Sequence, residues 1–414
     1  MLPIALSSEH KMKWLIYVCY HFPKISETFI LEELRHLSHC YLLAVVALNN
    51  PRENGIETPP YLQQIFYFEN TFRTKKGYQH LVQAILWFLI RRPIRLLEAW
   101  ALLPDCKQWT LYLAGILFAF KYRSISPMHI HATFSAESAT MAAIMAKLLN
   151  QSYSVTDQAQ DYIAKMTGIY AHLKQSSLFF TSCLYTKKQL LKQNPYIPSE
   201  KIKIVYSGID PDRFQPSAEL NPDNRYRLIT VTRFIDTKGL PDIFHALALI
   251  IKDYPFIQYD LIGSGPLQSA LYRLAVNLQI NDLIHWRNVI PNQQLPDYYR
   301  QASIFILPCV ITPRLVEDSL PLVIGEAMAA ELVVITTPVG GIHELVKHNY
   351  NGIIVKPRSP QMIASAIRHI FEETEFYRPI RINARTSVIK YYNSKLEKLK
   401  LVGLYRQYEK KLFI

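Results

Sequence analysis

The stretch Asp318–Glu344, with the sequence DSLPLVIGEAMAAELVVITTPVGGIHE, decides the fold that we predict for this chain. Ser319 is of a type that caps helix starts, and Pro321 is tolerated in a first helical turn. Residues 322–330 are almost continuously apolar, which predicts a helix that is buried on most of its sides. The run Leu332–Thr336 then predicts a short β-branched strand. We therefore expect a buried β/α unit here.

One carboxylate, Glu326, stands in the middle of this apolar helix. A charge that is buried without a partner costs several kcal/mol, so this carboxylate must meet a cation, a hydrogen-bond donor or a ligand. After the strand, Pro338–Gly341 predicts a tight turn into the next helix, and its backbone amides suit an anion such as a diphosphate. The alternative is an ordinary buried β/α unit whose glutamate pairs with a core arginine.

Composition narrows the class of protein. The 414 residues suffice for about two or three domains with ample cores. The formal net charge of +13 favours anionic partners such as phosphate-bearing ligands, acidic lipid surfaces or nucleic acid. The five cysteines lie far apart and form no C-x-x-C pair, which indicates a reducing compartment and no metal framework. Residues 1–13 lack an apolar signal core, so we expect no secretion signal.

Predicted strands and helices alternate along both halves of the chain. Trp14–Tyr20 is the first strand, and Gln258–Ile262 and Ile304–Leu307 are strands of the second half. Such alternation predicts an α/β fold with parallel sheets, ligand loops at one sheet edge and a cleft between two domains. The polar residues 207–225 predict a linker. The expected domains are then 1–206 and 226–380, followed by terminal helices at 381–414.

Residues 75–123 differ from the rest of the first half. Apolar helical runs, Leu81–Ile90 and Leu96–Leu103, alternate with eight lysines and arginines, while Glu98 and Asp105 are the acids of the segment. Neither run approaches the roughly 20 apolar residues that a membrane span requires. Basic residues beside Trp and Leu suit helices that lie on an anionic membrane surface. The alternative is that these helices cover the sheet and that the basic residues form its solvated rim.

Two histidines, His129 and His131, alternate on a predicted strand and therefore face one side. A metal site would need a further ligand at suitable spacing, and Thr133 stands where a third histidine would continue the alternation. We therefore interpret both histidines as structural and expect no metal site.

A predicted loop in the second half carries Arg233 and Lys238, at a spacing that suits the oxygens of one phosphate and a second phosphate beyond it. The segment Gly263–Gln268, GSGPLQ, lacks the third glycine of G-x-G-x-x-G, and its Pro266 would start the helix at once. The sequence therefore argues against a dinucleotide-dependent oxidoreductase.

Taken in order, these motifs resemble those of the retaining glycosyltransferases of family 4, which have the GT-B fold of two Rossmann-like β/α/β domains facing across a cleft. The N-terminal half is similar to a narrower group that builds exopolysaccharides such as colanic acid. The segments that carry the likeness are Phe22–Ile30 (FPKISETFI), His129–Phe134 (HIHATF), Tyr206–Phe214 (YSGIDPDRF), Val231–Gly239 (VTRFIDTKG), Gly263–Leu267 (GSGPL) and the opening stretch.

The resemblance implies a role for each matching residue. Arg233 and Lys238 would neutralise the donor diphosphate, and Asp318 would hold sugar hydroxyls near the reacting carbon. Glu326 would bind the nucleotide ribose hydroxyls. Fixed cations at the leaving diphosphate would then do the work of a metal, and no cofactor is expected. The further donor-binding positions are Gly263, Gly265, Leu320, Gly340 and Gly341, and those on the acceptor and sugar side are Ser26, Glu27, Gln158 and Asp161.

Five departures from the family pattern affect this prediction. Asp318 and Ser319 stand where the family usually has Glu and Gly. Glu331 and Val333 stand where the family has Gly and Pro, so we expect a different turn after the central helix. Gln158 replaces a histidine that lies near the transferred sugar in similar proteins, and an amide cannot exchange a proton near neutral pH.

The sequence thus predicts a hexosyltransferase that uses a UDP- or GDP-linked sugar and a lipid-linked or oligosaccharide acceptor. Its expected place is the cytoplasm, peripherally at the inner face of the plasma membrane. The rival is a catalytically silent binding or scaffold protein of a polysaccharide assembly machine, which Gln158, Glu331 and Val333 favour. A nucleic-acid binder is not favoured, because the basic residues cluster beside apolar helices rather than among exposed aromatics in a groove.

Overall fold

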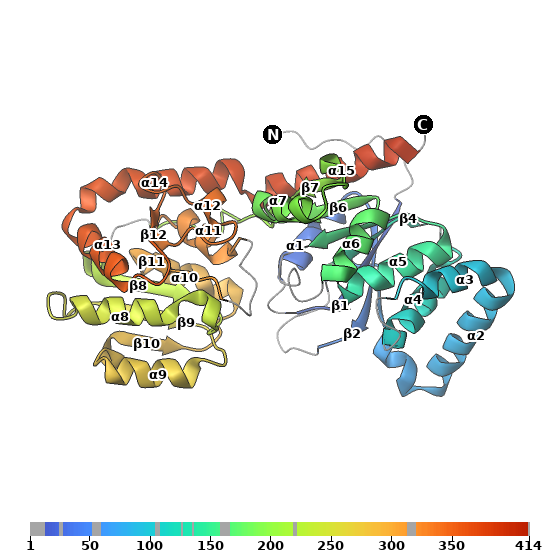
Figure 1. Cartoon of the computed structure of the whole chain (residues 1–414), viewed down its shortest axis with the longest axis horizontal. Coiled ribbons are helices and arrows are strands. Elements are labelled where there is room, and N and C mark those ends of the chain that lie inside the picture. The colour runs from blue at the N-terminus through green and yellow to red at the C-terminus, as the bar shows by residue number, and fades with distance from the viewer. Residues whose placement is uncertain are drawn as a thin grey trace. The chain divides into compact units, whose positions relative to one another are not determined.

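The computed structural model describes residues 13–24, 28–51, 59–103, 108–125, 127–134, 136–157, 166–217, 222–312 and 320–412. The chain forms two compact units (Figure 1). Unit 1 contains residues 1–181, 191–203 and 398–414, and unit 2 contains residues 182–190 and 204–397.

Unit 1 is built on a seven-stranded sheet in the order β3-β2-β1-β4-β5-β6-β7. The pairings from β3 through β6 are parallel. The central strands are buried along nearly their whole length, as expected of a sheet covered on both faces. The strands are β1 (Trp14–His21), β2 (Leu42–Asn49), β3 (Gln64–Tyr67), β4 (Pro127–Thr133), β5 (Tyr153–Asp157), β6 (Leu178–Thr181) and β7 (Ile202–Ile204).

The helices of unit 1 differ in burial. Helix α4 is apolar around its circumference and is almost wholly buried against α5, whereas α2 and α3 lie outside it with large exposed faces. The predicted helical run 81–90 falls within α2. The run 96–103 overlaps α3, which ends at Trp100. The helices are α1 (Thr28–Leu37), α2 (Lys75–Arg91), α3 (Pro93–Trp100), α4 (Trp109–Tyr122), α5 (Glu137–Leu149), α6 (Met166–Gln175) and α7 (Leu184–Gln193), of which α7 begins in unit 2.

Unit 2 has a six-stranded parallel sheet in the order β10-β9-β8-β11-β12-β13. Its apolar residues form two buried clusters. The strands are β8 (Arg227–Val231), β9 (Gln258–Ile262), β10 (Ile284–Arg287), β11 (Ile304–Leu307), β12 (Val333–Thr336) and β13 (Ile353–Ile354). The helices are α8 (Leu240–Ile250), α9 (Gln268–Asn277), α10 (Leu295–Arg300), α11 (Leu322–Ala329), α12 (Ile342–Leu345), α13 (Pro360–Glu372) and α14 (Thr374–Tyr391).

Short 3₁₀ helices connect some of these elements: η2 (Phe68–Arg73), η4 (Ser199–Lys201), η5 (Pro222–Tyr226), η6 (Asp236–Lys238), η7 (Asn281–Leu283) and η8 (Asn292–Gln294).

The last helix, α15 (Ser394–Leu412), belongs to unit 1 from Lys398 onward. Lys398 Nζ lies 3.3 Å from Glu33 of α1, and both side chains are buried. Tyr17 donates a hydrogen bond to the same carboxylate. The nearby cation and these hydrogen bonds hold the pKa of Glu33 below its usual value despite the opposing effect of burial. A buried ion pair therefore anchors the C-terminal helix to the first unit.

The polar segment 207–225, predicted as a linker, is packed into unit 2 along part of its length. Ile209 and Phe214 belong to one of its buried clusters, and Ile209 exchanges backbone hydrogen bonds with Tyr392 and Ser394. The mostly polar composition of the segment did not predict that these two apolar residues are buried in unit 2.

The turn after α11 is built around Glu331. Glu331 adopts a left-handed conformation with φ of 59°. The amide of Glu331 bonds to the carbonyl of Met328, and that of Leu332 to the carbonyl of Ala327. This is the Schellman arrangement that glycine ordinarily serves. The left-handed turn therefore forms with glutamate in it, and the expected difference from the family's turn stays a prediction. Pro321 also lies just before α11 instead of within its first turn.

Candidate functional site

The loops that follow the strands of the second sheet meet at one edge, because all six strands are parallel. Strands β8 and β11 are neighbours at the centre of the sheet, although β9 and β10 come between them in sequence. The order of the strands reverses at this point, and open α/β sheets bind ligands beside such a reversal, outside the carboxyl ends of the strands. The loops after β8, β9, β11 and β12 contain the described donor-side residues predicted from the sequence, apart from Glu326.

Two glycines allow the loops after β8 and β9 to pack against each other. Gly263 has φ of +139°, and a Cβ atom there would lie 1.9 Å from the carbonyl oxygen of Thr232. A Cβ atom on Gly265 would lie 2.5 Å from the carbonyl oxygen of Phe234. The amide of Phe234 donates to Ser264 at 2.8 Å. The two loops approach so closely that a side chain cannot fit, which explains the G-S-G sequence.

The loop that carries Lys238 is fixed to the loop after β11. Gly239, at φ of +64°, passes so close to Pro308 that a Cβ atom would lie 2.0 Å from its carbonyl oxygen. Val310 donates its amide to the carbonyl of Thr237 at 2.9 Å. Lys238 itself is only 6% exposed, whereas Arg233 on the same loop is exposed. The structure thus places one buried and one exposed cation at this edge.

The turn after β12 joins the same group of loops. Thr337 donates its hydroxyl to the carbonyl of Cys309 at 2.5 Å. Gly340 has φ of +59°, and Gly341 directly precedes α12, as the predicted turn requires. Leu320 is half-buried against the nearby apolar cluster.

The buried carboxylate of Glu326 lies in the second turn of α11, in the helix that leads away from this edge. Tyr299 of α10 donates a hydrogen bond to Glu326 Oε2 at 3.0 Å. Burial raises the pKa of Glu326 to about 7, against the opposing influence of this hydrogen bond and of the Arg213 charge. Arg213 instead donates to the backbone and side-chain oxygens of Asn292. Within the described residues, no arginine pairs directly with Glu326, in contrast to the alternative of a core ion pair.

The remaining predicted residues cannot be placed. Asp318 lies outside the described part of the chain, as do Ser26, Glu27, Gln158 and Asp161 of the acceptor side. The described donor residues are joined in two groups: the glycine loops with Lys238 and Arg233, and Glu326 with Tyr299. In the described part of the chain, no hydrogen bond or ion pair links these two groups directly; they share the helix and loop that follow β11.

Three residues of this region carried no predicted role. Tyr299 bonds to Glu326 and the charge of Arg213 acts on it, and neither residue is near Glu326 in sequence. Glu344 closes the GGIHE motif; its carboxylate accepts hydrogen bonds from the first amides of α7, Leu184 and Tyr185, within unit 2. Glu344 was part of the recognised motif, but its spacing alone could not indicate a helix cap about 160 residues away.

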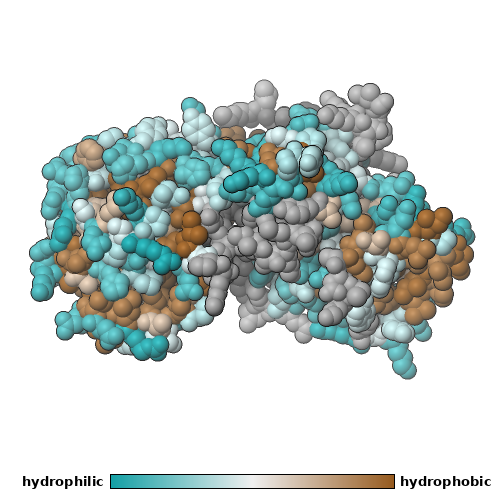
Figure 2. Space-filling view, viewed as in Figure 1, coloured by the Kyte–Doolittle hydropathy of each residue, from teal (hydrophilic) through white to brown (hydrophobic). Residues whose placement is uncertain are grey.

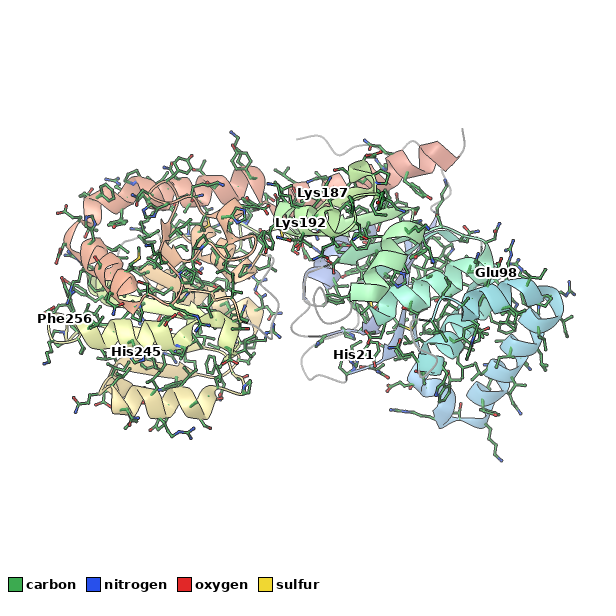
Figure 3. The ribbon with its side chains drawn as sticks, in the orientation of Figure 1. His21, Glu98, Lys187, Lys192, His245 and Phe256 are labelled. Atoms are coloured by element: carbon green, nitrogen blue, oxygen red, sulfur yellow. The ribbon has the colours of Figure 1, made fainter. Side chains whose placement is uncertain are left out.

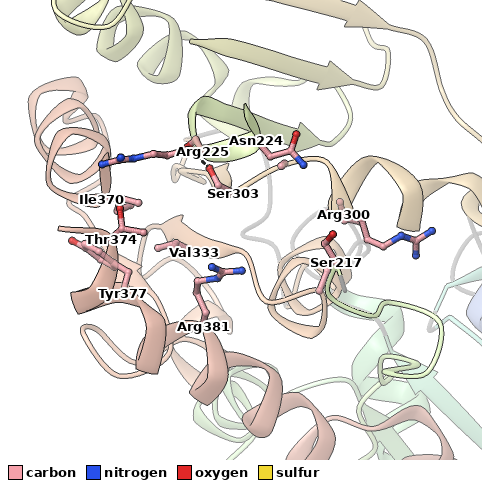
Figure 4. A pocket seen from close by; sticks show the side chains of 13 residues that line it. Ser217, Asn224, Arg225, Arg300, Ser303, Val333, Ile370, Thr374, Tyr377 and Arg381 are labelled. Carbon is pink, nitrogen blue, oxygen red and sulfur yellow. Dashed lines mark hydrogen bonds between the residues drawn. The ribbon is translucent and has the colours of Figure 1, made fainter. Parts of the chain in front are cut away.

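A cavity of about 360 Å³ opens at the opposite edge of this sheet (Figure 4). Ser303 and Val333, which line it, stand at the amino ends of β11 and β12. Arg225, Arg300 and Arg381 also line it, and Arg381 donates to the carbonyl of Glu331 at 2.6 Å. Its position away from the carboxyl ends argues against a donor site here.

The structure supports the structural interpretation of the two histidines. Both are buried; His131 Nδ1 lies 2.7 Å from the hydroxyl of Ser154, and the rings of both pack against Tyr405 of α15. Burial lowers the pKa of His129 to about 3 and that of His131 to about 4. Within the described residues, no group of three or more His, Cys, Asp or Glu side chains could hold a metal ion.

Comparison with known proteins identifies the C-terminal part. Residues 212–387 match the family model "Glycosyl transferases group 1". These residues form a glycosyl transferases group 1 domain. It contains Arg233, Lys238, Glu326 and all the glycine loops described above.

Some relatives of this chain are named for bacterial polysaccharide biosynthesis. The amylovoran biosynthesis glycosyltransferase AmsK of Erwinia amylovora is 26% identical over 47% of this chain and 48% of its own length. WcaL of Escherichia coli, named for colanic acid biosynthesis, is 26% identical over 50% of this chain and 51% of its own length. The chain thus spans about half the length of these relatives.

The fold extends beyond the group 1 domain. The crystal structure of Anabaena Alr3699/HepE in complex with UDP and glucose covers 95% of this chain and 99% of that protein, with a TM-score of 0.72 at 14% identity. This likeness and the two parallel-sheet units confirm the predicted GT-B fold. Among the described helices, none has the length and apolar character needed to cross a membrane.

Proposed function

We propose that this protein is a retaining glycosyltransferase of family 4, which transfers a sugar from a UDP- or GDP-linked donor to a lipid-linked or oligosaccharide acceptor of a surface polysaccharide. The observation that carries this proposal is the buried carboxylate of Glu326, held by Tyr299 without a paired cation in the described residues of a group 1 domain. A ligand that donates hydroxyl hydrogen bonds would compensate this carboxylate, and a nucleotide ribose has two such hydroxyls.

The arrangement of charges suits departure of a nucleoside diphosphate. In the proposed reaction, negative charge develops on the β-phosphate as the sugar carbon leaves it. Lys238 and Arg233 would stabilise that charge at the sheet edge, and because the loops are fixed in advance, little reorganisation would be needed. The enzyme would position the acceptor hydroxyl on the same face of the sugar, and Asp318 would orient the sugar hydroxyls. We propose that no metal takes part.

The relatives support the substrate class. Proteins named for amylovoran and colanic acid biosynthesis are similar to this chain over 47% and 50% of its length, and the Anabaena protein of similar fold was crystallised with UDP and glucose. We propose that the protein works in the cytoplasm at the inner face of the plasma membrane, where a lipid-linked acceptor would be presented.

Calorimetric titration with UDP, GDP and their common sugar conjugates tests the proposal. We expect one nucleotide class to bind the wild type, and binding to weaken at least about tenfold in Glu326→Ala and Lys238→Ala, since each removes a charged contact. Lys252→Ala, an exposed lysine of the same unit, is the matched control and should bind normally. Failure of every nucleotide to bind would refute the proposal.

A second set of measurements separates turnover from binding. Release of free sugar, or transfer to a lipid-linked acceptor with an unchanged anomeric configuration by NMR, would establish a retaining enzyme. Activity that survives a chelator would support the metal-free proposal. Gln158 favours the alternative of a silent binding protein; nucleotide binding with no transfer to any supplied acceptor would support that alternative instead.

A further inference from the structure

Helix α2 has two apolar faces, one buried and one exposed. Leu81, Ala84 and Phe88 are buried in unit 1. Tyr78, Val82, Leu86 and Leu89 recur at spacings of four, four and three residues on another face, and their exposed fractions are 58%, 39%, 50% and 53%. A surface helix of a globular protein ordinarily places polar residues on its outer face. The second apolar face therefore lacks an explanation within the unit.

Helix α3 extends this surface. Ile94, Leu97 and Trp100 recur at intervals of three residues and are 71%, 73% and 46% exposed. Figure 2 shows hydrophobic side chains gathered over α2 and α3 at the right of the view. We call the exposed apolar residues of α2 and α3 the outer face. Contiguous exposed apolar surface of this kind usually marks an interaction site.

The charges around the outer face are mostly positive. Arg91, Arg92 and Arg95 lie where α2 meets α3, and with the end of α5 they line a shallow hollow of about 570 Å³. Lys75 and Lys76 begin α2. The two helices contain a single acid, Glu98 (Figure 3), whose carboxylate lies 3.3 Å from Lys147 Nζ.

We infer that the outer face docks on the surface of an anionic lipid bilayer. Helices in this position lie in the plane of the interface, with their apolar side chains among the acyl chains and their basic residues at the head groups. Tyr78 and Trp100 are residue types that concentrate at that depth. The arginine hollow has the charge and hydrogen-bond donors that suit a lipid phosphate.

A second copy of the chain fits this surface less well. In a two-fold dimer the same patch meets itself, which would bring Arg91, Arg92 and Arg95 of one protomer toward those of its partner. Glu98, the one acid of the described helices α2 and α3, already pairs with Lys147. The charge therefore favours an acidic partner over self-association.

Vesicle co-sedimentation tests this inference with the full chain and without donor or acceptor. The inference rests on the proposed function only for the choice of membrane. If the protein does not bind vesicles, the proposal of nucleotide binding and sugar transfer still stands. We expect the wild type to bind vesicles of phosphatidylcholine with phosphatidylglycerol, and to bind pure phosphatidylcholine much less. Raising the salt to ~1 M should weaken binding to the vesicles, because attraction between surface charges then extends only about 3 Å.

Two variants separate the apolar and charged contributions. Leu89→Gln, Ile94→Gln and Leu97→Gln combined should weaken binding about tenfold or more, and Arg91→Gln with Arg95→Gln should remove most of the preference for the anionic lipid. The matched controls are Leu249→Gln, Tyr272→Gln and Val276→Gln combined, at exposed apolar positions of unit 2, and Lys188→Gln with Lys192→Gln on α7. Both controls should bind as the wild type does.

All these side chains are exposed or half-exposed, so thermal melts should show that every variant folds. Absence of wild-type binding to anionic vesicles would overturn the inference. Equal loss in the control variants would also overturn it, since binding would then not depend on the outer face. A dimer of the wild type that dissociates in the Leu89, Ile94 and Leu97 variant would assign the face to a second copy of the chain instead.

Discussion

Replacing Glu326 by Gln should stabilise unit 2 and weaken nucleotide binding, which are two effects of opposite sign from one carboxylate. The substitution keeps the shape of the side chain and removes its charge. Burial raises the pKa of Glu326 from 4.5 to about 7. This difference corresponds to a destabilisation on the order of 3 kcal/mol when the carboxyl is ionised. The variant does not carry that cost.

The direction of the pKa shift of Glu326 sets the pH range in which wild type and variant differ in stability. Because the folded pKa lies above the unfolded value, the protonated form contributes stability that is fully present below pH 4.5 and is lost as the pH rises through about 7. Wild type and Glu326→Gln should therefore have nearly equal free energies of unfolding around pH 4.5. They should diverge above it, with the variant more stable at pH 8.

Urea unfolding across this pH range, followed by a probe in unit 2, measures the difference. Glu375→Gln, an exposed glutamate on α14, is the matched control and should follow the wild type at every pH. The nucleotide affinity of Glu326→Gln should fall in parallel. A variant that is less stable than the wild type at pH 8 would refute this reasoning, because it would mean that the carboxylate is satisfied by a cation in the folded chain.

Further substitutions test the fold. Glu331→Gly should raise the free energy of unfolding by about 1 kcal/mol, since a left-handed residue other than glycine costs roughly that amount; unchanged urea unfolding would contradict this. Gly263→Ala should destabilise unit 2 by about 1–3 kcal/mol through backbone strain. Gly403→Ala, where no atom lies within 4 Å of an added Cβ, should be neutral or stabilising. Lys398→Met should cost about 3–5 kcal/mol in unit 1 by leaving Glu33 buried without its cation, and Glu33→Gln added to it should recover part of that loss in thermal melts.

Local patterns predicted the elements that consist of one continuous apolar run between polar or glycine boundaries. Strands Gln258–Ile262 and Ile304–Leu307 have the predicted bounds. The glycine loops were also predictable, because few residue types fit two backbones in contact. The composition of residues 75–123 did not separate the buried α4 from the exposed α2 and α3, since all three are rich in the same apolar residues.

Contacts between distant residues set the limit of prediction for the candidate site. A buried glutamate in an apolar helix signalled that Glu326 needs a partner, but nothing local identified Tyr299, which lies 27 positions earlier. The Glu331 turn shows the same limit. A glutamate gives no local sign of the left-handed conformation that glycine ordinarily adopts, and the hydrogen bonds that end α11 hold it there.

The two units are specialised in different ways, and this makes their functions separable. Unit 2 contains Gly239, Gly263, Gly265 and Gly340, all at positive φ, at the carboxyl edge of its sheet, where bare backbone can approach a ligand. The glycines of unit 1 that are described with their surroundings, Gly77, Gly115 and Gly403, lie in helices instead. The large exposed apolar face, in turn, belongs to unit 1. If the donor site and the lipid surface are independent, Glu326→Gln should bind vesicles normally, and the outer-face variants should bind nucleotide normally. Loss of both properties in either variant would show that the two sites are coupled through the chain.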